Sequence, residues 1–293
     1  MTLPEKFNRD DSGQSVRFSL VVATLGRERE LGRLFESLAI QTYDNFEVLV
    51  VDQNADDRIV PLIEKFQKKL GIVHLTSEPG LSRARNVGLE YAAGEVIAFP
   101  DDDCWYPPNV LQEVDTALRR SPLIDGITGR YSNDCGKTEG RWQKCSGAVG
   151  RENVWRTAIS FTIFLRRELI GSIGEFDEQL GVGSGSRWGS GEETDYLLRA
   201  LAKGAQIRYN PELWIRHPVK VTGVCTADSL RRVRTYAAGA GRVIAKHEYG
   251  IAYKAFFLSK PLLKILFNGA LLRTGLARLA AAELGGRISG LRG

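Results

Sequence analysis

Three consecutive aspartates, Asp101, Asp102 and Asp103, are the residues of this sequence best suited to chemistry. They follow residues 95–99 (EVIAF), an apolar run typical of a buried strand, which predicts their side chains at the strand's carboxyl end. In open α/β sheets, ligands bind at that edge. Adjacent carboxylates repel one another, and Mg2+ is typically held by one or two carboxylates together with substrate phosphates. The triplet therefore predicts a metal–diphosphate site, with a solvated acidic turn as the alternative.

A second acidic group, residues 192–195 (EETD), stands at the start of a predicted helix whose apolar face lies within 197–202. Acidic residues in a first turn also serve simply as partners of the helix dipole. The preceding segment 181–191 (GVGSGSRWGSG) is rich in glycine and serine and carries Trp188. Long flexible segments beside a site are commonly lids or binding loops, so we interpret this one as such, with a plain linker as the alternative.

One histidine, His217, follows two short predicted strands at 205–209 and 213–215. A lone histidine is more often structural than a metal ligand. His217 is nevertheless one of only three histidines in the chain, so it stays a candidate.

These groups depend on strands that alternate with helices. Apolar runs predict strands at 18–24, 46–51, 72–75 and 95–99, and apolar periodicity predicts helices at 28–41, 57–70, 82–93 and from the Pro107-Pro108 pair to about 120. Near-continuous apolar strands in such alternation predict an α/β fold, with a mostly parallel central sheet and helices on both faces.

The charge of the chain is unevenly distributed. The net charge is +5 over 293 residues, but from Lys220 onward the balance is +10, which leaves an acidic remainder. We expect a flexible N-terminus at 1–17, a catalytic domain at 18–222 and a basic, amphipathic helical extension at 223–293. The apolar stretch 255–272 is interrupted by Lys260, Pro261 and Lys264, so we predict no membrane-spanning helix. A helix lying in the membrane interface is expected; packing on the domain is the alternative.

The cysteines and the N-terminus indicate the compartment. Four cysteines without a CxxC pair argue against a zinc site and suit a reducing compartment. Residues 1–14 lack the apolar core of a secretory signal. We expect a cytoplasmic protein, peripheral on the inner face of the cell membrane. The basic tail lacks a nucleic-acid-binding motif, so no nucleic-acid partner is expected.

In this order, the motifs resemble those of family-2 inverting glycosyltransferases of the GT-A fold, over a stretch from Phe18 to His217. The family's opening turn resembles Thr24-Leu25-Gly26-Arg27, where the usual Pro-Thr-Tyr-Asn is altered. Its second strand resembles Val50-Val51-Asp52, and its first helical motif resembles residues 80–86 (GLSRARN). The later motifs correspond to residues 94–103 (GEVIAFPDDD), 175–178 (EFDE), 191–195 (GEETD) and 214–217 (WIRH).

The resemblance implies roles for individual residues. It implies that Mg2+ or Mn2+ is bound by Asp101, Asp103 and His217, and that Asp102 binds the ribose or the donor sugar. It further implies nucleotide-sugar binding by Thr24, Arg27 and Asp52, with the base N–H donating to Asp52. Arg83 or Arg85 would pair with the diphosphate, because a planar guanidinium suits phosphate oxygens, and we favour Arg83.

The motif at 191–195 implies acceptor chemistry. Glu193 stands where the family usually has an aspartate base, and Glu192 is the second candidate. Trp188 and Asp195 are expected to bind the acceptor, a glycan or a lipid-linked glycan.

Two other functions stay open from the residues alone. A nucleotidyltransferase can share this fold class and a metal-bound aspartate, but Gly26-Arg27 offers little of its usual glycine-rich signature with lysine. A non-catalytic glycan- or membrane-binding module on the same fold is the other alternative.

Overall fold

The computed structural model describes residues 17–133, 135–136, 138, 142–218 and 224–293. They divide into two compact units, which we describe separately. Unit 1 contains residues 17–79, 83–175 and 196–218, and unit 2 contains residues 80–82, 176–195 and 224–293. The boundaries expected from the sequence instead placed residues 80–82 and 176–195 in the catalytic domain at 18–222. The expected N-terminal segment lies outside the described residues apart from Arg17, and the expected boundary at 222/223 also lies outside them.

Unit 1 is built on one eight-stranded sheet with the order β3-β2-β1-β4-β7-β5-β8-β6. The strands are β1 (Phe18–Thr24), β2 (Phe46–Asp52), β3 (Gly71–Thr76), β4 (Val96–Ala98), β5 (Gly126–Ser132), β6 (Gly147–Ala148), β7 (Ile163–Arg166) and β8 (Ile207–Arg216). β1 to β4 pair in parallel, as does β5 with β8, whereas β7 runs antiparallel to β4 and β5 and β6 antiparallel to β8. The predicted α/β class with a mostly parallel sheet is confirmed.

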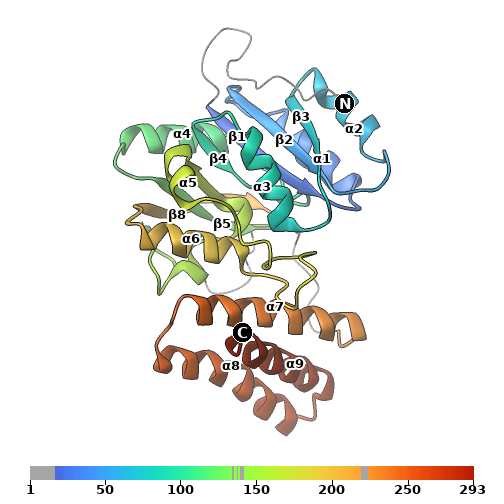
Figure 1. Cartoon of the computed structure of the whole chain (residues 1–293), viewed down its shortest axis with the longest axis vertical. Helices are drawn as coiled ribbons and strands as arrows, with labels where there is room; N and C mark the ends of the chain where they lie inside the picture. The colour runs from blue at the N-terminus through green and yellow to red at the C-terminus, as the bar shows by residue number, and fades with distance from the viewer. Residues whose placement is uncertain (1–16, 134, 137, 139–141, 219–223) are drawn as a thin grey trace. The chain divides into compact units, whose positions relative to one another are not determined.

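Helices cover both faces of this sheet (Figure 1). The helices that contribute to unit 1 are α1 (Arg29–Leu38), α2 (Val60–Gln67), α3 (Leu81–Tyr91), α4 (Val110–Arg120), α5 (Arg167–Ile173) and α6 (Glu192–Ala202). The apolar stripes of α1, α2 and α4 join Leu20 and Val48 in one core on one face. On the other face α3 approaches closely, because a Cβ on Gly88 would collide with Val21.

The strand register brings polar residues to one edge. Thr24 at the end of β1 pairs with Asp52 at the end of β2, and Ala23 forms a parallel bridge with Asp101 just beyond β4. The carboxyl ends of neighbouring parallel strands therefore present Thr24, Asp52 and the aspartate triplet side by side, as ligand sites in such sheets require.

The second half of the sheet differs from the prediction. The two short strands expected at 205–209 and 213–215 are one strand, β8, whose register against β5 shifts between Thr128 and Arg130. Pro211 lies within the irregular part of β8, where its missing N–H costs no ladder hydrogen bond. The sequence suggested a break where the strand carries a bulge.

Unit 2 contains the helices α7 (Ala227–Lys246), α8 (Ile251–Ala270) and α9 (Thr274–Leu291). α7 and α9 lie close together because glycines face the partner backbone: a Cβ on Gly286 would collide with the Arg234 carbonyl, and one on Gly290 with the Ala238 carbonyl. The predicted helical extension is thus confirmed. Among the described residues, no helix combines the length and apolar character needed to cross a bilayer.

Candidate active site

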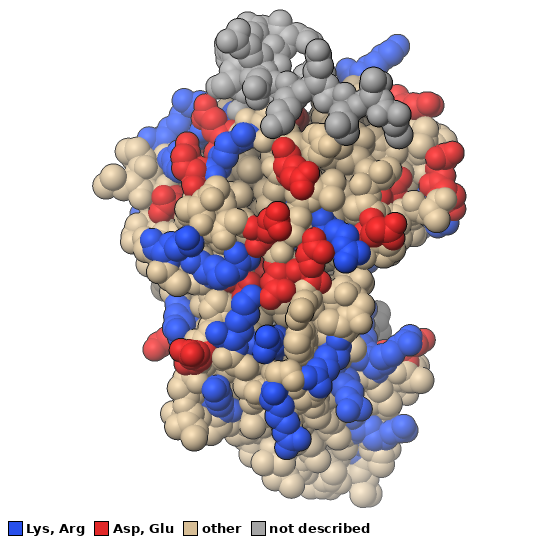
Figure 2. Space-filling model, in the orientation of Figure 1, with Lys and Arg blue, Asp and Glu red and all other residues tan. Residues whose placement is uncertain are grey.

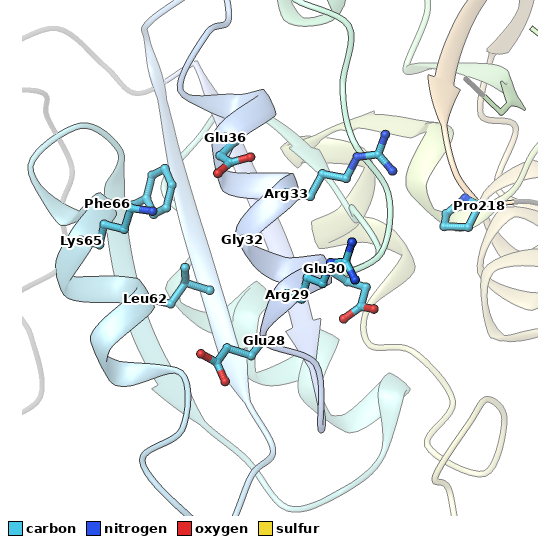
Figure 3. Close-up of a pocket in the computed structure, with 10 residues that line it drawn as sticks. All are labelled: Glu28, Arg29, Glu30, Gly32, Arg33, Glu36, Leu62, Lys65, Phe66 and Pro218. Carbon is cyan, nitrogen blue, oxygen red and sulfur yellow. The ribbon is translucent and has the colours of Figure 1, made fainter. Parts of the chain in front are cut away.

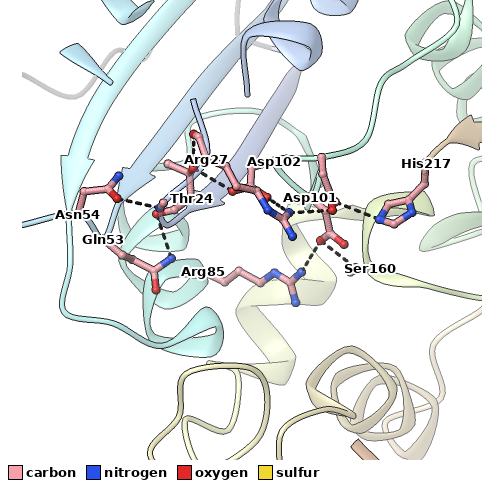
Figure 4. Close-up of polar contacts among 11 residues, drawn as sticks. Thr24, Arg27, Gln53, Asn54, Arg85, Asp101, Asp102, Ser160 and His217 are labelled. Carbon is pink, nitrogen blue, oxygen red and sulfur yellow. Dashed lines mark hydrogen bonds and ion pairs between the residues drawn. The ribbon is translucent and has the colours of Figure 1, made fainter. Parts of the chain in front are cut away.

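Asp101 is fixed at the sheet edge by its neighbours (Figure 4). Its Oδ1 accepts hydrogen bonds from Arg85 Nη2 at 3.2 Å and from Ser160 Oγ at 3.0 Å. Its backbone forms a bridge with Ala23 of β1, so the sheet fixes the position of the carboxylate. Ser160 was not singled out in the sequence, and its only signal was a place just before the apolar run 161–165.

Asp102 turns toward β1 rather than toward Asp101. Its Oδ2 accepts a hydrogen bond from Thr24 Oγ1 at 2.9 Å, and its Oδ1 forms an ion pair with Arg27 Nη1 at 2.5 Å. Burial raises the pKa of Asp102 to about 6, although Arg27 and Thr24 lower it. Thr24, Arg27 and Asp102 therefore form one connected group.

Asp103 lies between a histidine and an arginine. Its Oδ1 is 3.0 Å from His217 Nε2, and its Oδ2 is 2.8 Å from Arg27 Nη1. Asp101, Asp103 and His217 each offer a ligand atom, and these atoms all lie within 4.8 Å of one another. The three residues expected to bind a metal are thus brought together in unit 1.

The imidazole of His217 is oriented as a metal ligand requires. Its Nδ1 lies 2.8 Å from the Pro218 carbonyl, which can only accept, so Nδ1 carries a proton. Nε2 then faces the carboxylate of Asp103. The ring is stacked on Phe161 with centroids 4.9 Å apart. A ligating histidine usually donates one ring N–H to a carbonyl in this way, which leaves its other nitrogen directed at the metal site.

The carboxylate of Asp52 is buried at the end of β2. Its Oδ1 accepts from the backbone N and Nδ2 of Asn54 at 2.9 and 2.7 Å, and its Oδ2 lies 3.2 Å from His74 Nε2. His74 lies on the neighbouring strand β3, opposite Val50. Neither partner was singled out in the sequence, although period-two alternation along 72–75 could have placed His74 on the face of Asp52.

The two arginines of α3 lie on the opposite sides of the helix from those expected. Arg85 is the inward one: it is 1% exposed and its guanidinium pairs with Asp101. Arg83 Nη1 donates to the Pro79 carbonyl at 3.4 Å. Residues two apart on a helix point in opposite directions, so only one of the pair can face the sheet. The expected inward orientation of Arg83 is therefore wrong, and pairing with the diphosphate stays a prediction for either arginine.

The acidic residues of the second motif belong to unit 2. Glu192 is buried and lies against Gly181, whose Cβ would meet its Oε2 at 3.2 Å, whereas Glu193 is half-buried. Asp195 is fully buried, and its Oδ1 lies 2.8 Å from His247 Nε2 and 2.9 Å from Lys246 Nζ. The ammonium of Lys246 and the imidazole of His247 thus both contact this buried oxygen, and acceptor binding by Asp195 stays a prediction.

Trp188 lies in the loop 181–191 of unit 2. The guanidinium of Arg242 lies 4.6 Å from the centroid of the Trp188 ring, a cation–π distance. The backbone carbonyl of Trp188 accepts a hydrogen bond from Gly181 N at 3.0 Å. This bond closes the loop upon itself. Within the described part of the chain, the indole Nε1 is buried without a hydrogen-bond partner.

A cavity of about 880 Å³ lies along α1 in unit 1 (Figure 3). Its lining carries both signs of charge: Glu28, Arg29, Glu30, Gly32, Arg33, Glu36, Leu62, Lys65, Phe66 and Pro218. It shares no residue with the aspartate group, so we place the candidate site at the sheet edge and not in this cavity.

The model of glycosyl transferase family 2 matches residues 19–174 of this sequence. The chain belongs to this family. Its central sheet is accordingly the sheet of a GT-A fold. The match contains the aspartate triplet and both arginines of α3. The acidic motif at 192–195 and His217 lie beyond it.

Named relatives agree with the family. The chain is 33% identical to the putative glycosyltransferase EpsH of Bacillus subtilis over 41% of its length, a match that spans 36% of EpsH. It is 26% identical to the succinoglycan biosynthesis protein ExoM of Rhizobium meliloti over 77% of its length and 74% of ExoM.

Solved structures share the fold at low sequence identity. Residues 1–349 of Staphylococcus aureus TarS in complex with UDP-GlcNAc align with a TM-score of 0.59 and 17% identity, over 94% of this chain and 92% of that one. The mannosyltransferase PcManGT of Pyrobaculum calidifontis, in complex with GDP-Man and Mn2+, aligns with a TM-score of 0.61 and 17% identity, over 94% and 87%.

Proposed function

We propose that this chain is a metal-dependent, inverting glycosyltransferase, and that it moves a sugar from a UDP-sugar to a glycan or lipid-linked acceptor in bacterial surface polysaccharide synthesis. The observation that carries the proposal is the grouping of Asp101, Asp103 and His217 at the carboxyl edge of parallel strands. The similarity to ExoM, a succinoglycan biosynthesis protein, supports the polysaccharide, and the similarity to TarS in complex with UDP-GlcNAc supports the UDP-sugar.

The donor set fits a divalent cation. Two carboxylates supply hard oxygen ligands, and the Nε2 of His217 is directed at them by the bond from Nδ1 to Pro218. Mg2+ and Mn2+ are the candidates, and Mn2+ accompanies GDP-Man in PcManGT. When bound, such an ion would act as a Lewis acid on the departing nucleoside diphosphate.

The remaining residues of the edge would bind the donor. Asp102, held by Thr24 and Arg27, offers carboxylate oxygens to the ribose or donor-sugar hydroxyls. Asp52 would accept from the base N–H. Arg85 is the arginine that would pair with the diphosphate, because its guanidinium already lies beside Asp101.

Inversion by direct displacement requires a base on the acceptor. The acceptor oxygen forms a bond to the anomeric carbon, the bond from that carbon to the diphosphate breaks, and the hydroxyl proton passes to a carboxylate. We assign this role to Glu193, with Glu192 as the second candidate, because Glu193 is the more accessible of the two. We propose that Trp188 contributes to acceptor binding from the loop 181–191, which precedes α6.

We also propose a cytoplasmic enzyme that is peripheral on the inner face of the membrane, where lipid-linked glycans are assembled. The basic, amphipathic helices of unit 2 support this placement.

The deciding experiment is a donor panel with product analysis. The purified chain is mixed with UDP-, GDP- and dTDP-sugars, with Mn2+ or Mg2+, and both its melting temperature and the released nucleotide are measured. We expect a metal-dependent rise in melting temperature with a UDP-sugar and release of UDP. Release of pyrophosphate from a nucleoside triphosphate would instead indicate a nucleotidyltransferase. Tight donor binding without turnover over any acceptor would indicate a non-catalytic module.

A further inference from the structure

An exposed apolar face runs along α8 in unit 2. Phe256, Leu263 and Phe267 are 58%, 63% and 62% exposed, and they recur at spacings that place them on one side of a helix. Leu262 and Leu266, also exposed, widen this face, which we call the α8 apolar face. Large side chains gathered this way on one helix differ from the single exposed apolar residues found on any soluble surface.

The opposite side of α8 is already occupied by α9. Pro261 is buried, the guanidinium of Arg287 lies 4.0 Å from the ring centroid of Phe257, and Lys264 Nζ lies 2.9 Å from Glu283 Oε2. Glu283 also pairs with Arg287 at 2.5 Å. These contacts fix the rotation of α8 about its own axis. The α8 apolar face therefore points away from α9.

The charged residues in the sequence around this face are predominantly basic. Between Glu248 and Glu283 the sequence has no acidic residue, whereas it has Lys254, Lys260, Lys264, Arg273 and Arg278. Lys260 Nζ lies 4.4 Å from the ring centroid of Phe256, so its stem follows the apolar surface while its charge remains at the edge. Figure 2 shows blue and tan side chains predominating over red ones on the visible side of α7, α8 and α9.

We propose that the α8 apolar face inserts into the interface of an anionic lipid bilayer, with Phe256, Leu263 and Phe267 among the acyl chains. Lys260, at the edge of this face, would then lie at the level of the lipid phosphates. Apolar burial combined with attraction to anionic lipids is how interfacial helices bind.

A bilayer fits this face better than a second copy of the chain. A twofold interface brings the same patch of both copies together, so basic flanks would meet basic flanks without acidic partners. An anionic lipid surface neutralises them instead. This inference deepens the proposed function, because it names the surface by which a lipid-linked acceptor would be reached.

The test measures binding of the full chain to vesicles, without donor or acceptor. Vesicles of phosphatidylcholine with phosphatidylglycerol are compared with phosphatidylcholine alone by sedimentation. We expect binding to the anionic vesicles only, decreasing with added salt because screening weakens the attraction. The variant Phe256→Ser/Leu263→Ser/Phe267→Ser should bind at least about tenfold more weakly, since three large apolar side chains no longer enter the bilayer.

Two controls separate the proposal from misfolding. Leu123→Ser removes an apolar side chain that is 87% exposed in unit 1, and it should bind like the unmodified chain. Lys260→Gln/Arg273→Gln keeps the apolar residues and should lose mainly the anionic preference. The triple variant should keep its melting temperature and its UDP release. Because vesicle binding is measured without donor or acceptor, its result does not depend on the proposed function.

Equal binding by the unmodified chain and the triple variant would overturn the proposal, as would absence of binding to either vesicle. A dimer in light scattering that the triple variant converts to a monomer, without vesicle binding, would assign the face to a second copy instead.

Discussion

Arg27 Nη1 lies 2.8 Å from Asp103 Oδ2, on the oxygen opposite the one that faces His217. The same nitrogen lies 2.5 Å from Asp102 Oδ1. One guanidinium therefore neutralises two of three adjacent carboxylates, and it shares Asp103 with the proposed cation. The arginine and a bound metal ion would compete electrostatically for the same residue.

Arg27→Met should change metal affinity in the direction of tighter binding. Without the guanidinium the aspartate group carries a larger negative charge, so the dissociation constant for Mn2+, measured by calorimetry without nucleotide, should fall by about tenfold, equivalent to about 1.4 kcal/mol. The metal-free protein should lose about 1–2 kcal/mol of unfolding free energy, less than for a fully buried pair because the side chain is 40% exposed. Arg58→Met, at a surface pair with Asp56, is the control. An unchanged Mn2+ affinity would contradict the competition.

Asp103→Asn should abolish metal-dependent activity. The amide keeps the shape of the side chain but removes the charge between His217 and Arg27, so Mn2+ affinity should fall by at least about 100-fold and UDP release with it. Asp102→Asn, outside the three-residue metal group, should weaken donor binding while Mn2+ still binds. If Asp103→Asn and the unmodified enzyme titrate alike with metal, the assignment of the metal site is wrong.

Glu193→Gln should separate binding from transfer. Donor affinity should be retained, because the side chain is not part of the sheet edge, whereas kcat should fall by about 10²–10⁴-fold with loss of the base. Glu192→Gln is the matched comparison on the same turn, and its smaller effect is expected from its burial. A larger loss of kcat in Glu192→Gln would reverse the two assignments.

Lys246→Met should loosen the segment that carries Glu193. Lys246 Nζ lies 2.7 Å from Asp177 Oδ2 and 2.9 Å from Asp195 Oδ1, and so ties together the two ends of the intervening loop. We expect a loss of about 1–3 kcal/mol in urea unfolding and a fall in kcat with little change in donor KM. A double-mutant cycle with Asp177→Asn should give a coupling energy of about 0.5–3 kcal/mol. Arg231→Met, at an exposed pair with Asp228, should change neither quantity. Additive effects of Lys246→Met and Asp177→Asn would refute the tie.

Glu47→Gln should alter the pH dependence of stability. Burial raises the pKa of Glu47 above its ordinary value, even though Ser19 and the backbone of Ala93 donate hydrogen bonds to it. Its protonated form is therefore favoured by folding, and the stability it contributes below its unfolded pKa is lost as pH rises through the folded pKa. The glutamine cannot ionise, so the variant should gain stability relative to the unmodified protein as pH rises from about 4.5. Unfolding curves across that range that stay parallel would contradict this assignment.

Sequence reasoning located the sheet edge well, for a physical reason. Apolar strands that alternate with amphipathic helices can form few arrangements, so the ends of β1, β2 and β4 had to lie side by side. It failed at Arg83 and Arg85, where both residues are compatible with a solvated helix. The small residue Gly88, three positions after Arg85, was the available sign that this side of α3 meets the sheet.

Other features depended on contacts between segments distant in the chain. Asp195 belongs to the acidic motif, but its partners His247 and Lys246 come from the end of α7, and no local pattern links them. The sequence likewise placed Asp52 at the sheet edge without indicating that His74 and Asn54 hold its carboxylate.

The bulge of β8 has a consequence for how this enzyme can diverge. Beyond the bulge, the alternation of side chains along β8 determines which way His217 points. A one-residue deletion among Asn210, Pro211 and Glu212 would remove no ionisable group of the site. It would nevertheless shift the residues that follow by one position, and so turn the imidazole of His217 away from the sheet edge. Homologues that share the aspartates but differ in length at this point are thus expected to recruit a different third ligand.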